Sequence, residues 1–268
     1  MKRFFVFPAI FTLFILSGCF DTAEEITIKD NGSGMYVSSM DMGKLMGMAK
    51  SMGGDNKEMK EIEDMKKDTL INLKDIKDSL KNLSAAEKKI IESGTLKVKI
   101  DMQEEQFAFT FSFPFSKTDD IKDINSVLNK TKQQILTKAM KDKLGKDDED
   151  SDNVKMFDKE AKDGDSEMMG SEVNEYYTRT WAANKLTNKI KKEKIAKMEE
   201  DEGLATLKQM SQMGITVNMK TVINLPKAAK KAEGKGVKLS DDKKKVTIEG
   251  SLDDFFENAS YFEYEIEY

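Results

Sequence analysis

The residues that most often perform catalysis are nearly absent from this sequence. Its 268 residues include no histidine and one cysteine, Cys19. Without histidine, the chain lacks the commonest general base, most zinc sites and every catalytic triad built on imidazole. Paired carboxylates could still act as acid and base, but the 49 Asp and Glu residues single out no pair. We therefore expect a protein that is not an enzyme and has no cofactor, no catalytic residues and no metal site.

Cys19 follows a segment with the features of an export signal. Two basic residues precede an apolar run over residues 4–16, and a small Ser-Gly pair separates this run from the cysteine. As a helix, the run would span about 20 Å, which is less than a bilayer core of about 30 Å. Leu-Ser-Gly-Cys resembles the lipobox of bacterial lipoproteins, in which the cysteine is lipidated and becomes the first mature residue. The alternative is an ordinary signal that leaves a spare thiol.

The expected organisation is a signal peptide over residues 1–18, a lipidated tether over residues 19–23 and a single domain over residues 24–268. Acyl chains such as palmitate on Cys19 would bind the mature chain to a membrane of the bacterial cell envelope, since two or more chains give stable anchoring. No later segment is apolar over a membrane length, so the domain is expected outside the bilayer and outside the cytoplasm. Without a second cysteine, its fold must rely on a hydrophobic core.

The strongest local bias is an acidic segment at about residues 145–175. It contains twelve Asp and Glu residues against four lysines, and its few apolar residues show no period. We therefore expect a disordered surface insertion. Three aspartates match the first ligand positions of an EF-hand calcium loop. However, Asn153 replaces the turn glycine and Lys159 replaces the bidentate glutamate, which argues against a calcium site.

Methionine is concentrated between Met35 and Met65, which include eight of the eighteen methionines. Thioethers are soft ligands suited to Cu(I), and such a site would need no histidine. Methionine is also a flexible filler of cores and of adaptable apolar surfaces. We favour the second interpretation and keep Cu(I) binding as an alternative.

Lysines gather in the tail, from Lys227 to Lys245. They lack interleaved aromatic residues for base stacking, and the chain carries an export signal, so we expect no nucleic-acid partner. Beside a membrane, each such lysine could contribute about 1 kcal/mol with anionic lipid. Ordinary solvated lysines are the simpler interpretation.

The periodicity of apolar residues predicts an α+β fold: an antiparallel sheet of hairpin-paired strands with long amphipathic helices inserted between them. Phenylalanines alternate along residues 107–113, which predicts one buried face rather than an exposed binding face. The predicted strands cover residues 24–29, 35–39, 95–101, 106–113, 215–225, 237–239, 244–249 and 261–268. The predicted helices cover residues 41–53, 57–83, 84–91, 119–144 and 185–213.

The Asn31-Gly32-Ser33-Gly34 turn between two strands, Leu225-Pro226 and the turn from Leu239 to Lys244 resemble uncharacterised LppM-like lipoproteins of bacteria. The resemblance covers mainly the first forty and the last fifty residues of the mature chain. It implies an α+β domain beside the membrane and no known catalytic motif, and it adds no site residue.

These features predict a lipid-anchored, non-catalytic lipoprotein of the cell envelope that recognises a partner protein or an apolar ligand. The alternative is a carrier of lipid-like molecules, whose enclosed apolar pocket would be lined by the phenylalanine strand and the methionine-rich helices. Packed apolar faces would favour recognition, an apolar cavity would favour a carrier, and converging carboxylates with raised pKa values would favour an enzyme.

Overall fold

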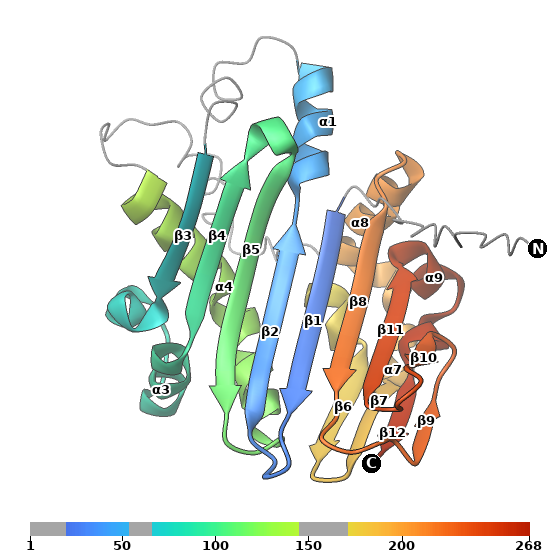
Figure 1. Ribbon diagram of the computed structural model, residues 1–268. Coiled ribbons are helices and arrows are strands. Elements are labelled where there is room, and N and C mark those ends of the chain that lie inside the picture. The colour runs from blue at the N-terminus through green and yellow to red at the C-terminus, as the bar shows by residue number, and fades with distance from the viewer. Residues whose placement is uncertain (1–19, 54–65, 145–170) are drawn as a thin grey trace, which may run out of the picture.

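The computed structural model describes residues 20–53, 66–144 and 171–268. Over these residues the chain forms α+β structure with twelve strands in two sheets (Figure 1). The larger sheet has the strand order β10-β11-β8-β1-β2-β5-β4-β3, and the smaller sheet has the order β6-β7-β12-β9. In Figure 1, α4, β6 and β7 lie behind the larger sheet, and its front face is uncovered by the drawn helices.

The strands of the larger sheet are β1 (Phe20–Ile28), β2 (Gly34–Asp41), β3 (Lys66–Asn72), β4 (Thr95–Asp101), β5 (Gln106–Phe115), β8 (Val217–Asn224), β10 (Val237–Leu239) and β11 (Lys245–Ser251). Those of the smaller sheet are β6 (Tyr177–Ala182), β7 (Lys185–Ile190), β9 (Lys231–Glu233) and β12 (Tyr264–Glu267). The α-helices are α1 (Gly43–Gly53), α3 (Ala85–Ser93), α4 (Asp120–Leu144), α6 (Ser171–Glu175), α7 (Lys192–Ile195), α8 (Glu202–Gln212) and α9 (Leu252–Glu257).

Elements with a strong local signal lie where the sequence predicts them. The hairpin of β1 and β2 turns through Gly32, whose φ of 80° suits glycine. Ser84 and Glu87 form the predicted capping box at the start of α3. The predicted strands β4, β5, β8 and β11 and the helices α1 and α4 are also present, with ends shifted by a few residues.

The phenylalanine face of β5 is buried, as predicted. Phe107, Phe109, Phe111 and Phe113 are each at most 2% exposed, and they belong to one core with the buried side of α4. The Phe113 ring lies so close to Gly94 that a Cβ there would come within 2.2 Å of it. The strand also continues through Pro114 to Phe115, two residues beyond its predicted end at Phe113.

The centre of the larger sheet is not antiparallel. β1 pairs with β8 in parallel, with Glu24 opposite Thr221, while the other strand pairs among the described residues are antiparallel. The Thr22 hydroxyl reaches the backbone carbonyl of Asn218, 196 residues further along the chain. Hairpin patterns specify only neighbours in sequence, so they do not reveal this partner.

Two predicted long helices are wrong. The helix predicted over residues 57–83 is replaced from Lys66 by β3 and two short 3-10 turns, and residues 57–65 lie outside the described part of the chain. Leu73, Ile76 and Leu80 have helical spacing, yet they become buried in and beside these turns. The helix predicted over residues 185–213 is instead β7, α7 and α8, because Leu186 and Asn188 face the interior on a strand.

Three predicted boundaries are also displaced. β1 begins at Phe20, which is fully buried, so residues 20–23 belong to the sheet rather than to a tether. Residues 171–175 form α6 and are not part of a disordered insertion. The final strand begins at Tyr264 rather than Tyr261, after a 3-10 turn. Among the described helices, none is long and apolar enough to cross a bilayer.

Candidate functional site

Polar side chains cross the inner face of each sheet, where apolar side chains are the rule. Strand pairing aligns three of them across β8, β1 and β2, and three more across β6, β7 and β12. All six line one cavity between the sheets. We call them the two polar rows: Thr221, Glu24 and Ser38 on the larger sheet, and Arg179, Asn188 and Tyr264 on the smaller sheet.

An ion pair joins the two polar rows. Arg179 Nη1 donates to both carboxylate oxygens of Glu24, at 2.9 and 2.7 Å. The Tyr36 hydroxyl donates to the same carboxylate at 2.9 Å, and Arg179 Nη2 donates to Asn174 Oδ1 at 2.8 Å. The side chains of Arg179 and Glu24 are only 17% and 14% exposed. The pair is therefore largely withdrawn from water, and its geometry is fixed by these hydrogen bonds.

Three titratable side chains of the cavity, Arg179, Tyr36 and Tyr264, have a raised pKa. Burial alone would lower the pKa of Arg179, but the Glu24 carboxylate, together with Tyr264 and Tyr36, outweighs burial and raises that pKa. Burial, followed by the charge of Glu24, raises the pKa of Tyr36 well above its usual value. Burial also raises the pKa of Tyr264. Arginine and both tyrosines therefore keep their protons at neutral pH and can act as hydrogen-bond donors.

Several polar atoms around this cavity of about 80 Å³ lack a partner. Arg179 Nε, Asn188 Oδ1 and the Tyr264 hydroxyl are buried and have no hydrogen-bond partner among the described residues. A buried group left unsatisfied costs about 1–3 kcal/mol, and such groups are uncommon in folded proteins. A bound polar molecule, water included, would satisfy these groups.

A second cavity of about 240 Å³ shares five lining residues with the first: Glu24, Asn129, Asn174, Tyr177 and Arg179. We call it the α4 cavity, because residues at helical spacing on α4 form one of its walls. Its remaining lining residues are Lys122 and Asn125 on α4, Thr178 and Trp181 on β6, and Lys191 after β7. Lys122 and Asn129 are exposed, so this cavity opens toward solvent.

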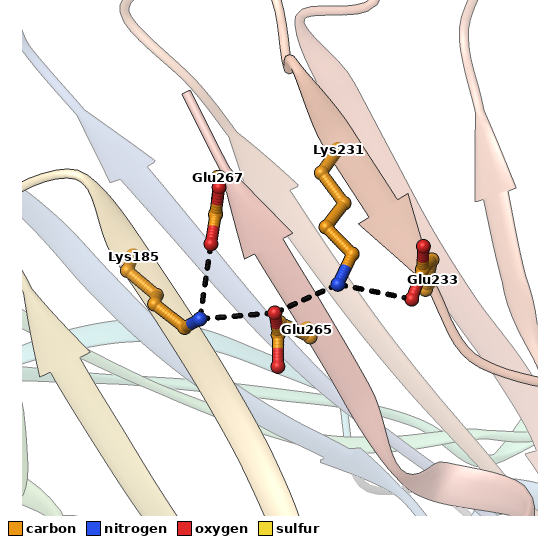
Figure 2. Close-up of polar contacts among 5 residues, drawn as sticks. All are labelled: Lys185, Lys231, Glu233, Glu265 and Glu267. Carbon is orange, nitrogen blue, oxygen red and sulfur yellow. Dashed lines mark hydrogen bonds and ion pairs between the residues drawn. The ribbon is translucent and has the colours of Figure 1, made fainter.

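The opposite face of the smaller sheet carries a different set of charges. Figure 2 shows Lys185 between Glu265 and Glu267, with Nζ to carboxylate distances of 2.9 and 3.0 Å. Lys231 likewise lies between Glu265 and Glu233, at 2.8 and 3.1 Å. We call these five residues the outer ladder. Hydrogen bonds from Lys231 and then Lys185 lower the pKa of Glu265 to about 2.

The residues singled out by the sequence lie elsewhere. Cys19 and residues 145–170 of the acidic segment are outside the described residues. Met40 is buried, and Met42 and Met46 pack against the core, whereas residues 54–65 are not described. In the described ranges, no group of three or more His, Cys, Asp or Glu residues could hold a metal ion.

Three aromatic residues that are close in sequence, Tyr176, Tyr177 and Trp181, divide between the core and the cavities. Tyr176 and Tyr177 both pack against the ring of Phe255, at centroid distances of 5.7 and 6.3 Å. Trp181 lines the α4 cavity, and its indole Nε1 is buried without a partner among the described residues. Tail lysines such as Lys231 and Lys238 form ion pairs with glutamates.

Sequence reasoning missed Glu24 and Arg179, although two signals were present. Glu24 has the same strand parity as Ile26 and Ile28, so a charge occupies a core position. The 44 basic residues include only two arginines, and Arg179 is the only one after Arg3. Arginine differs from lysine in offering a planar fork for bidentate pairing. An isolated arginine in a lysine-rich chain therefore indicates a position that needs this geometry.

Comparison with known proteins adds no relative. No family model, curated protein or solved structure matches the chain, so the resemblance to LppM-like lipoproteins stays a prediction from its sequence.

Proposed function

We propose that this protein is a lipid-anchored, non-catalytic lipoprotein of the bacterial cell envelope that binds a small polar ligand between its two sheets. The export signal and the lipobox-like Leu-Ser-Gly-Cys support the anchor at Cys19. The observation that carries the binding role is the Arg179–Glu24 pair between the two polar rows. It occupies positions at which apolar residues would give an equally good or better core.

The protonation states favour binding over catalysis. A general acid or base works best with a pKa near the operating pH. Here burial moves the pKa of Tyr36 and Tyr264 away from neutrality, and the Glu24 carboxylate does the same for Arg179. These groups are suited to recognise a ligand through fixed donors.

A polar ligand has more support than the lipid-like cargo of a carrier. The phenylalanines of β5, expected to line an apolar pocket in a carrier, are packed in the core. The two cavities described above have walls rich in Asn, Lys, Thr and Ser. The ligand of this proposal is therefore hydrophilic.

The start of β1 specifies how the anchor would hold the domain. Phe20 is fully buried, and its backbone N–H donates to the Thr216 carbonyl at 3.1 Å. Only one peptide bond separates it from Cys19. A lipid on Cys19 would therefore hold the folded domain directly against the head groups, without a flexible tether.

Native mass spectrometry of the full chain, extracted from membranes in mild detergent, tests both parts of this proposal. We expect a covalent acyl-derived mass that the Cys19→Ala variant lacks, together with a small polar adduct that leaves on collisional activation. An unmodified mass would contradict the anchor. A bare folded protein, or an apolar adduct, would contradict the binding role.

A further inference from the structure

We infer that the α4 cavity binds a small hydroxylated carboxylate, a sugar acid of monosaccharide size. The inference rests on the proposed binding role and specifies the class of ligand. It follows from the charge, the hydrogen-bonding groups and the size of this cavity.

The charge of the wall favours an anion. Its one carboxylate, Glu24, is already neutralised by Arg179, whose Nη1 donates to both carboxylate oxygens. Lys122 and Lys191 add two positive charges, and neither has a carboxylate partner in the described part of the chain. Among the described residues, the Lys191 ammonium donates only to the Glu175 backbone carbonyl, at 2.9 Å, which leaves further donors for a ligand. An incoming carboxylate would therefore meet uncompensated cations.

The hydrogen-bonding groups of the wall suit hydroxyls. Asn125 and Asn129 on α4 each provide an amide that can both donate and accept, as a sugar hydroxyl requires. The Trp181 indole N–H and Arg179 Nε are buried donors that lack a partner among the described residues. These unsatisfied donors distinguish the cavity from an ordinary surface depression with lysines around it.

The size of the cavity limits the ligand. Its volume of about 240 Å³ lies below the range of about 300–1,000 Å³ that is typical of drug-sized ligands. An extended lipid or a peptide would not fit. A six-carbon acid with several hydroxyls is of the right order.

The chain offers a reporter in the cavity wall, because Trp181 is its only tryptophan. We would titrate the full chain, in a detergent without a sugar head group, with D-glucuronate and with D-glucose. The two probes have the same ring and differ in the carboxylate. We expect glucuronate, but not glucose, to give a saturable change in Trp181 emission, weakened by added salt.

Lysine variants test whether the anion occupies this cavity. Lys122→Gln and Lys191→Gln should each weaken glucuronate binding about tenfold, as expected for a lost charge-assisted hydrogen bond. Lys189→Gln, on an exposed position of β7 outside the wall, should leave it unchanged. All three substitutions lie at partly or fully exposed sites, so the fold should persist, and circular dichroism checks this.

Three outcomes would overturn the inference: equal binding of glucose, no saturable response to glucuronate, or equal affinity in all three lysine variants. The first would leave the proposed binding role intact. The second, together with a bare chain in native mass spectrometry, would contradict the binding role as well.

Discussion

The smaller sheet carries charges on both faces, and these charges differ in how far they are exposed to water. Inside, Arg179 is held by Glu24 from the other sheet, beside polar atoms that lack partners in the described part of the chain. Outside, the outer ladder alternates lysine and glutamate, with side chains from 22% to 68% exposed (Figure 2). The outer ladder is typical of a solvated sheet surface. The inner pair is unusual, because charged side chains seldom occupy the buried face of a sheet.

Solvation explains the difference. Exposed ion pairs keep most of their hydration, so forming them costs little and contributes little. Taking Arg179 and Glu24 out of water costs several kcal/mol per ion, which their attraction only partly returns. Removing one partner of the inner pair should therefore lower the free energy of unfolding far more than removing one contact of the outer ladder.

The largest effect is expected from removing one partner of the inner pair. Arg179→Met should lower the free energy of unfolding by about 3–5 kcal/mol, because it leaves the Glu24 carboxylate buried and unpaired. Urea denaturation of the full chain in detergent measures this loss. Lys185→Met, on the outer face of the same sheet, is the matched control. Equal losses in both variants would remove the distinction between the two faces.

A smaller effect is expected at alkaline pH. Burial raises the pKa of Tyr36 in the folded state, while an unfolded tyrosine titrates near pH 10. The stability contributed by the protonated hydroxyl is therefore complete below about pH 10 and declines as the pH rises further. Denaturation of Tyr36→Phe between pH 8 and 11 should show a shallower decline than the wild type, and identical slopes would contradict the burial of this hydroxyl.

The outer ladder should respond to acid instead. The pKa of Glu265 is lowered to about 2 in the folded state, chiefly by hydrogen bonds from Lys231 and Lys185, against about 4.3 when unfolded. Its stabilising contribution is thus complete above about pH 4.5 and is lost as the pH falls toward 2. The stability difference between the wild type and Glu265→Gln should shrink over this interval. A difference that stays constant would exclude a role for this ionisation.

The smallest effect is expected from a single lysine of the outer ladder. Lys185→Gln removes two exposed contacts, and Glu265 keeps Lys231 as a partner. Thermal unfolding should change only slightly at low salt, and the change should vanish at about 1 M salt, where the Debye length is about 3 Å. A loss that persists in high salt would show that the outer ladder contributes more than screened attraction.

The contrast also explains how much the sequence could predict. Short-range signals such as the turn at Gly32 and the capping box at Ser84 were sufficient for their elements. Spacing alone misassigned the segment around Leu73 as helix, because its apolar side chains reach the core from turns instead. The candidate site depends on Glu24 meeting Arg179, 155 residues apart, through a parallel pairing and a second sheet. No local pattern contains that information.

In our interpretation, the two polar rows serve binding rather than stability. Equilibrium urea unfolding of the triple variant Glu24→Leu/Tyr36→Phe/Arg179→Met, followed by Trp181 fluorescence, tests it most directly. This variant replaces the ion pair and its hydroxyl partner together, so no charge is left unpaired. We expect a free energy of unfolding equal to or above that of the wild type. A loss of about 3–5 kcal/mol, as large as that of Arg179→Met alone, would contradict it.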